Sequence, residues 1–194
     1  MKIVGVGCGP GLLTRQAIEA ISQATLIFGS DRAIELARAY IAPACVVKAI
    51  DDYKKLRELE EDAVILSTGD PMLAGLGYLE GEVIPGISSL QVAAARLRVP
   101  LARIAIVVAH GTGHDMAIVE TVDELKRKKI VFLLTDPRFD INRLYDRIAH
   151  EVQGTVKIAI CENLGYPDER IVTGMLSERP EHRSDMYAMV IGNF

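Results

Sequence analysis

The chain has 194 residues, 49% of them apolar and 25% charged, with a formal net charge of −4 at pH 7. This length allows one large domain or two small ones, with ample apolar material for a core. The negative charge disfavours nucleic acid as a partner, because phosphate binding needs a basic face.

The three cysteines are far apart and show no Cys-x-x-Cys spacing: Cys8, Cys45 and Cys161. This pattern disfavours a disulfide framework or a zinc knuckle and is typical of a reducing compartment. The opening MKIVGVG lacks the apolar core of a signal peptide, and no run approaches the ~18 apolar residues of a membrane span. We therefore expect a cytoplasmic protein with no membrane partner.

Short β-branched runs alternate with helical patterns through the first 110 residues, which predicts a mainly parallel sheet covered on both faces. The predicted strands are 2–7, 25–29, 45–50, 63–68, 81–86 and 102–109. The predicted helices are 14–23, 31–40, 53–61 and 89–97. Ser30 or Asp31 can cap the second of these helices.

The glycine-rich loop 110–116 is the best candidate for a domain boundary, dividing the chain into domains 1–110 and 111–194. Beyond it, helices are predicted at 117–128 and 141–151. Strands are predicted at 129–135, 156–162, 170–176 and 186–192. Little helix separates the last two strands, so we expect a smaller α/β domain with a mixed sheet.

Three glycine-bearing segments directly follow predicted strands: GVGCGPG at 5–11, TGDPMLAGLG at 68–77 and PGISS at 85–89. The carboxyl ends of parallel strands share one edge of the sheet, where ligands bind. Each segment alone also fits an ordinary helix start, for example an Asp70 cap followed by Pro71. Together the three segments favour a site for a nucleotide-sized ligand.

A dinucleotide is the first ligand to consider, because Gly5-x-Gly7 lies between a strand and a helix and Asp31 follows the second strand. The Gly-x-Gly-x-x-Gly spacing fails, however, since its last position is Pro10. No Gly-Lys-Ser/Thr phosphate loop occurs either. These mismatches disfavour a nicotinamide dehydrogenase.

The three segments, in this order, resemble the tetrapyrrole (corrin and porphyrin) methyltransferases, which use S-adenosylmethionine (SAM). The resemblance is carried by VGVGCGPGLLT, STGDPMLAGLG and VIPGISSLQVAAARL. FGSDRAIEL, AHG, LLTDPR and CENLGYPDERI are most similar to the subgroup that methylates carbon 5 of precorrin-7 or cobalt-precorrin-7. The first loop departs from the family pattern by an extra Cys8 and a shorter path to Leu-Leu-Thr.

The resemblance implies a two-domain α/β fold, a homodimer, and SAM bound folded in the cleft between the domains. Asp70 would offer charge to the cationic part of SAM, and the helix start at Ser88 and Ser89 would face its carboxylate or ribose. The positions matched as cofactor-binding are Cys8, Gly9, Gly69, Asp70, Leu73, Ser88, Ser89, Thr135, Leu164 and Ala188.

Methyl transfer needs no metal, but the macrocycle must release a proton. His110, expected at a strand end, is the candidate base, and its alternative role is to hold the interdomain loop. His110 and His114 also have helical metal-ligand spacing, yet the glycines between them disfavour a helix, so we expect no metal site. A corrinoid carries many carboxylates, and the candidate contacts are Arg15, Arg32, Arg138 and Arg143.

Two kinds of alternative remain open. One is a family member that methylates another ring carbon or the precursor of diphthine. The other is a nucleotide- or SAM-binding module without catalysis, which would never yield S-adenosylhomocysteine.

Overall fold

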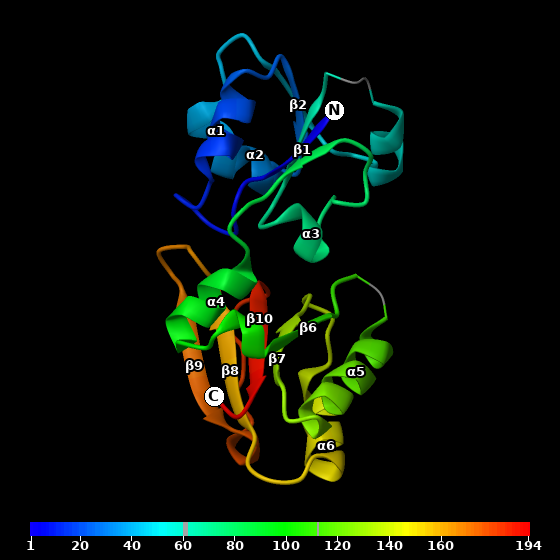
Figure 1. The fold of residues 1–194 in the computed structure, drawn as a ribbon, viewed down its shortest axis with the longest axis vertical. Helices are drawn as coiled ribbons and strands as arrows, with labels where there is room; N and C mark the ends of the chain where they lie inside the picture. Colours follow the sequence, from blue (N-terminus) through cyan, green and yellow to red (C-terminus); the bar gives the residue numbers. More distant parts are fainter. Residues whose placement is uncertain (60–61, 112) are drawn as a thin grey trace. The chain divides into compact units, whose positions relative to one another are not determined.

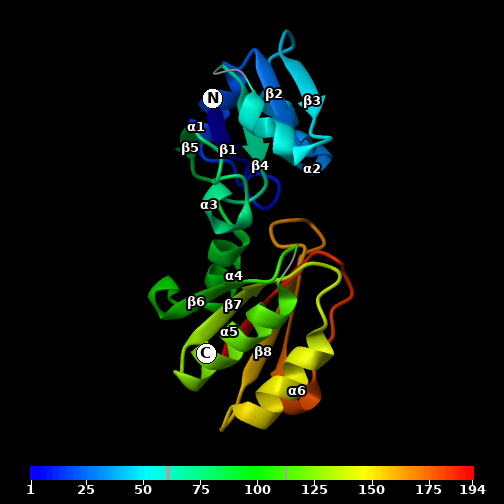
Figure 2. The ribbon, with the colours of Figure 1, turned by 90° about the vertical axis from the view of Figure 1, so that its right-hand side faces the viewer.

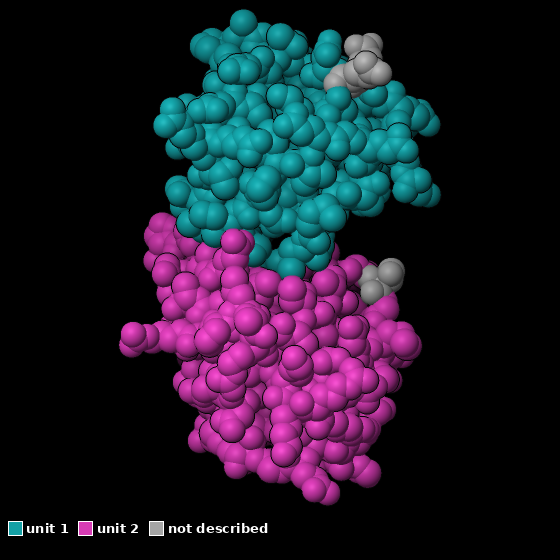
Figure 3. Space-filling view, in the orientation of Figure 1, with its two compact units in different colours: residues 1–89 teal, residues 90–194 magenta. Residues whose placement is uncertain are grey.

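A computed structural model of the chain describes residues 1–59, 62–111 and 113–194. The described residues form two compact units, 1–89 and 90–194, each with a sheet of its own (Figures 1, 2 and 3). The α/β class predicted from the sequence is confirmed in both units.

The first unit contains a five-stranded sheet whose neighbouring strands all run parallel. The strand order is β3-β2-β4-β1-β5. The strands are β1 (Lys2–Gly5), β2 (Leu26–Gly29), β3 (Val46–Ala49), β4 (Val64–Ser67) and β5 (Glu82–Ile84). Each was expected from its short β-branched run.

Both faces of the sheet are buried at the central strands β1 and β4, where successive side chains point to opposite faces, whereas the edge strand β3 is exposed. Val4 shares a core with buried residues of helices α1 (Arg15–Ser22) and α2 (Asp31–Ala37), and Figure 1 shows these two helices on the same side of the sheet. Its neighbour Ile3 faces the opposite side and packs with Leu56 and with a segment around Leu76. This two-sided burial explains the nearly continuous apolar strands.

Helix starts follow the caps expected from the sequence. The Ser30 hydroxyl accepts the N–H of Ala33 at the head of α2. The helix predicted at 53–61 is instead a 3-10 helix, η2 (Tyr53–Glu58). Leu56 is its one buried residue, so no apolar stripe supports a longer α-helix. Residues 60 and 61 of that prediction lie outside the described residues.

The second unit holds a mixed sheet with the order β6-β7-β10-β8-β9. Only β6 and β7 pair parallel, and the other neighbours are antiparallel. The strands are β6 (Ile104–Val108), β7 (Ile130–Leu134), β8 (Lys157–Glu162), β9 (Arg170–Met175) and β10 (Tyr187–Gly192). The mixed sheet predicted from the sequence is confirmed.

The remaining helices of the chain are short or cover the second sheet. Helices α5 (His114–Lys126) and α6 (Ile141–Glu151) share a core with one face of this sheet. The others are η1 (Arg38–Tyr40), α3 (Pro71–Ala74), α4 (Ser89–Leu97), η3 (Leu101–Arg103) and η4 (Leu176–Glu178). None of the helices in the described ranges is long and apolar enough to cross a membrane.

The division between the units differs from the boundary expected after His110. Strand β6 was expected to end the first domain, but it pairs residue by residue with β7, from Ile104 with Ile130 to Val108 with Leu134. Helix α5 forms the crossover between these parallel strands. The first unit therefore ends at Ser89, and the second unit is the longer one rather than the smaller.

Candidate functional site

The three glycine-bearing segments of the first unit meet at one edge of its sheet, as expected from the parallel strands. Gly7 and Gly69 exchange two backbone hydrogen bonds, with N···O distances of 3.2 Å from Gly7 N and 2.8 Å from Gly69 N. The N–H of Cys8 donates to the carbonyl of Ile87 at 2.9 Å. The first segment is thus bonded to both of the others.

Glycine is required where these segments cross. A Cβ placed on Gly86 would lie 2.1 Å from the carbonyl oxygen of Gly69. A Cβ on Gly5 would lie 2.5 Å from the nitrogen of Gly86. Real Cβ atoms essentially never approach other atoms closer than 3.0 Å, so side chains would force the loops apart.

Asp70 joins two of the loops through its carboxylate. Oδ1 accepts the N–H of Met72 at 2.8 Å and so caps α3, as the sequence predicted. Oδ2 accepts the N–H of Gly86 at 3.1 Å. Each carboxylate oxygen has a further acceptor site, so Asp70 can hold the loops and still present negative charge.

These loops leave open space next to Gly69. Gly69 has a φ of +69°, and a Cβ there would meet no atom within 4 Å. Open space therefore borders a backbone turn that carries the Asp70 carboxylate, which suits the cationic groups of SAM. Leu73 is half-buried in α3, Ser88 is buried, and Ser89 begins α4.

The two candidate arginines of the first unit differ in their surroundings. Arg32 donates from Nη2 to the carbonyl of Cys8 at 2.7 Å, which holds the first loop next to the buried Gly9. The Arg15 side chain is 93% exposed and pairs with Glu19 on its own helix. Arg32 therefore has a structural contact, whereas Arg15 lies in solvent.

Three positions matched to SAM binding lie near one another in the second unit. Thr135 follows β7, is buried, and donates from Oγ1 to the carbonyl of Tyr187 at 2.6 Å. Ala188 pairs with Leu134 across β7 and β10. Leu164 is buried just after β8, the strand on the other side of β10. The sheet register brings these sequence-distant residues together.

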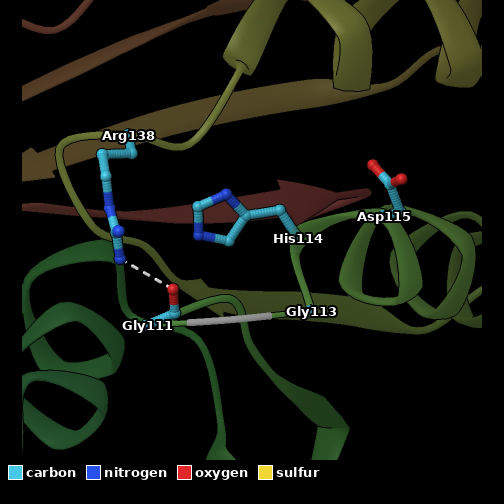
Figure 4. A pocket seen from close by; sticks show the side chains of 5 residues that line it. All are labelled: Gly111, Gly113, His114, Asp115 and Arg138. Atoms are coloured by element: carbon cyan, nitrogen blue, oxygen red, sulfur yellow. Dashed lines mark hydrogen bonds between the residues drawn. The ribbon is translucent and has the colours of Figure 1, made fainter.

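A cavity of about 380 Å³ opens beside the loops that follow β6 and β7. Figure 4 shows its lining residues, with the His114 ring and the Arg138 side chain on the same side and the Asp115 carboxylate turned away. The residues that line the cavity are Gly111, Gly113, His114, Asp115 and Arg138.

Asp136, beside the cavity-lining residues, is only 4% exposed and is surrounded by donors. Its Oδ2 accepts the N–H of Gly111 at 2.7 Å and Nε2 of His114 at 3.1 Å, and its Oδ1 accepts the N–H of Arg138 at 2.8 Å. Burial alone raises the pKa of Asp136, but these hydrogen bonds and the nearby imidazole bring that pKa well below its ordinary value. Asp136 is therefore a carboxylate that ties the two loops together.

The other predicted polar residues lie around this cavity. His110 is exposed, and its Nδ1 lies 3.3 Å from the carbonyl oxygen of Thr135. Arg138 donates from Nη2 to the carbonyl of Gly111 at 2.7 Å. Arg143 forms an ion pair with Asp115. Within residues 1–59, 62–111 and 113–194, no group of three or more His, Cys, Asp or Glu side chains has the geometry of a metal site.

The tetrapyrrole (corrin/porphyrin) methylase model matches residues 2–180. The chain belongs to this family. A probable cobalt-precorrin-7 C(5)-methyltransferase of Methanocaldococcus jannaschii is 32% identical over 192 residues, covering 89% of each chain. The crystal structure of a precorrin-6Y methylase from Archaeoglobus fulgidus is 31% identical and has a TM-score of 0.77. That alignment covers 99% of this chain and 96% of the other.

More distant structures show the same fold. A uroporphyrin-III C-methyltransferase from Thermus thermophilus, complexed with S-adenosylhomocysteine, is 19% identical with a TM-score of 0.72. The alignment covers 98% of this chain and 96% of that one. The predicted family and the two-domain tetrapyrrole methylase architecture are therefore confirmed.

The pairing of His114 with Asp136 is the feature that the sequence analysis missed. His114 was considered only as a metal ligand, and Asp136 appeared only within the motif LLTDPR, with no role assigned to it. A signal was present, because both residues follow predicted strands, 102–109 and 129–135. Thr112, which lies between the two glycines that were used to argue against a helix from His110 to His114, is outside the described residues.

Proposed function

We propose that this chain transfers a methyl group from SAM to carbon 5 of cobalt-precorrin-7 in cobalamin biosynthesis. The observation that carries the proposal is the 32% identity, over 89% of both chains, with a relative named for that reaction. A second relative, the cobalt-precorrin-7 C(5)-methyltransferase of Salmonella typhimurium, is 24% identical over 88% of each chain. Membership of the methylase family makes this chain a SAM-dependent methyltransferase.

SAM binding is assigned to the residues matched in the sequence. In the first unit, the crossed loops and the Asp70 carboxylate support the assignment, because they combine open space at Gly69 with negative charge. SAM supplies the methyl group when bound. The chain itself has to orient the acceptor carbon about 3–3.5 Å from that methyl group and exclude water. The assigned residues are Cys8, Gly9, Gly69, Asp70, Leu73, Ser88, Ser89, Thr135, Leu164 and Ala188.

Contacts to the corrinoid carboxylates are assigned to exposed arginines. Arg138 is 73% exposed in its side chain and borders the 380 Å³ cavity. Arg15 is 93% exposed. Each of the four arginines has a protein partner, and the Arg143 side chain, paired with Asp115, is less exposed at 56%, while Arg32 holds the Cys8 carbonyl. Arginine side chains that contact the substrate carboxylates would offset the overall charge of −4 locally.

The proposal also includes a cytoplasmic homodimer that needs no protein-bound metal and has neither a nucleic-acid nor a membrane partner. The family, the reducing-compartment cysteine pattern and the negative charge support it. Its competitors are a family member acting on another ring carbon or on the diphthine precursor, and a SAM-binding module without catalysis.

The deciding experiment incubates the purified chain with SAM carrying a ¹³C-methyl group and with cobalt-precorrin-7. The expected result is S-adenosylhomocysteine and a corrinoid with one new ¹³C-methyl group, located at carbon 5 by NMR. Metal-free precorrin-7 in a parallel reaction tests whether cobalt is needed. A methyl group on another carbon supports the first competitor. SAM binding without S-adenosylhomocysteine supports the second.

The arginine assignment has its own test. Arg138→Ala and Arg15→Ala are expected to raise the KM for the corrinoid while leaving the SAM dissociation constant unchanged. Arg127→Ala is the matched control, since Arg127 pairs with Glu124 on the surface of the same unit as Arg138. If neither Arg138→Ala nor Arg15→Ala changes the KM for the corrinoid more than Arg127→Ala does, the assignment is wrong.

A further inference from the structure

We propose that His114 accepts the proton which the macrocycle releases on methylation, and that Asp136 positions His114 for this step. The inference rests on the proposed methyltransferase function. It assigns a catalytic residue and a positioning residue within the cavity beside β6 and β7.

The contact between these residues determines which ring nitrogen carries the proton. Nε2 of His114 lies 3.1 Å from Oδ2 of Asp136. An ionised carboxylate only accepts hydrogen bonds, so Nε2 must be the nitrogen that donates. In the neutral imidazole, Nδ1 then holds a free lone pair. Among the described residues no hydrogen-bond partner engages Nδ1, and the side chain is 24% exposed.

Asp136 is suited to orient a base and unsuited to be one. Three backbone or ring donors, from Gly111, Arg138 and His114, engage its carboxylate at 2.7–3.1 Å. They keep its pKa low despite burial, so it holds no proton near neutral pH. A fixed negative charge on the far side of an imidazole favours the cation that forms when the imidazole takes up a proton.

The surroundings of His114 leave it open to a ligand. Gly111 and Gly113 line the cavity without side chains, and a Cβ on either would meet no atom within 4 Å. The rings of Phe139 and His114 pack edge to face, with centroids 5.6 Å apart, and this contact helps to fix the plane of the imidazole. A cavity of about 380 Å³ is large enough for one edge or side arm of a macrocycle.

The charged and titratable groups around the cavity come from four elements. The loop after β7 contributes Asp136 and Arg138, and the loop after β6 contributes His110. Helix α5 contributes Asp115, whose charge is offset by Arg143 of α6. The ionised pairs thus nearly cancel, and His114 is the group whose charge changes when a proton is accepted.

Proton release completes the chemical balance of the reaction. The ring carbon uses an electron pair to form the new carbon–carbon bond, and the methyl–sulfur bond breaks with its pair remaining on sulfur. The macrocycle gains one positive charge, which it loses when a proton leaves. His114 Nδ1 forms the new N–H bond, and the resulting imidazolium later returns the proton to water.

His110, the base candidate from the sequence, is less suited to this step. Its Nδ1 lies 3.3 Å from the Thr135 carbonyl oxygen, which is neutral, and the residue is exposed. No carboxylate contact holds it among the described residues. His110 therefore lacks the fixed orientation and the charge compensation that Asp136 provides for His114.

The first test is the tautomer of His114 in the free enzyme, measured by ¹⁵N NMR of imidazole-labelled protein. For the neutral ring, the expected spectrum shows protonated Nε2 and unprotonated Nδ1. Asp136→Asn is expected to alter this pattern, because an amide cannot accept all the hydrogen bonds that the carboxylate accepts. An Nδ1–H tautomer in the wild type overturns the proposal, whatever the activity.

The second test is kinetic. His114→Gln keeps an N–H donor for Asp136 but has no basic nitrogen, and kcat is expected to fall by roughly 100-fold or more. The SAM dissociation constant and the corrinoid KM should change by less than about threefold, since binding is retained. In His114→Ala, added imidazole should restore part of kcat. His150→Gln, an exposed histidine on α6, is the control and should behave as wild type.

The outcomes separate the two proposals. If the wild type makes product and His114→Gln keeps kcat within about fivefold, the role of His114 is refuted and the function stands. If the wild type makes no methylated product, the function is refuted. If the variants do not fold, the tautomer of the wild-type ring decides the role of His114.

Discussion

The crossing of the glycine loops can be tested by adding one methyl group at Gly86. In Gly86→Ala, the new Cβ would lie 2.1 Å from the carbonyl oxygen of Gly69 and 2.8 Å from the carbonyl carbon of Gly5. Both of these neighbouring atoms belong to the backbone, so no side-chain rotation relieves the overlap. The loops must move apart by about 1 Å to restore an ordinary contact.

The cost follows from what that movement breaks. Overpacking against a rigid backbone costs about 1–3 kcal/mol. Separation of the loops also stretches the two hydrogen bonds between Gly7 and Gly69, each contributing about 1 kcal/mol. We expect the free energy of unfolding to fall by about 3–5 kcal/mol in all. We also expect weaker SAM binding, because the same loops carry Asp70.

The assay is urea unfolding followed by circular dichroism, with calorimetric titration of SAM on the folded variant. Gly29→Ala is the matched control in the same unit, since the three atoms nearest to its Cβ would be side-chain carbons, the closest at 3.1 Å. The control should lose about 1 kcal/mol or less, because a side chain can shift. Equal stability of the two variants would refute the tight loop crossing.

Three further predictions concern buried or shared carboxylates. Asp70→Asn leaves an amide opposite the N–H of Gly86, so the SAM dissociation constant should rise about tenfold in calorimetry, and unchanged affinity would contradict the assigned role. Asp136→Asn should lower the free energy of unfolding by about 2 kcal/mol at pH 7. Because the pKa of Asp136 is lowered in the folded state, its contribution to the free energy of unfolding is complete above the unfolded pKa of about 3.9 and is lost at lower pH. The free energies of unfolding of Asp136→Asn and wild type, measured in urea, should therefore converge as the pH falls below about 4. Glu162 is 1% exposed and paired with Arg170, so Glu162→Gln should cost about 2 kcal/mol in urea unfolding, and a loss below 0.5 kcal/mol would show that the pair contributes little.

Much of the fold could be predicted because its signals are local. The alternation of Ile3 and Val4 between two cores is a property of any strand with period-two burial. The caps by Ser30 and Asp70 need only the hydroxyl or carboxylate and the next few N–H groups. The family resemblance rested on such local motifs, and it was confirmed.

The helix at 53–61 shows where local patterns fail. Its charged residues favour a helix by propensity, but only Leu56 reaches the core. Without a stripe of buried side chains, the segment forms a six-residue 3-10 helix after Asp52. Burial in the tertiary structure, which the local composition does not report, determined the outcome.

The sequence by itself determined the order of strands and helices, the caps and the three glycine loops, because each depends on neighbouring residues. The tertiary structure alone decided that β6 joins β7, since an apolar run such as 104–108 fits the edge of either sheet. It also decided that His114 meets Asp136, 22 positions away. That contact exists because a helical crossover returns the chain to the same edge of a parallel pair, and the length of the crossover carries no local signal.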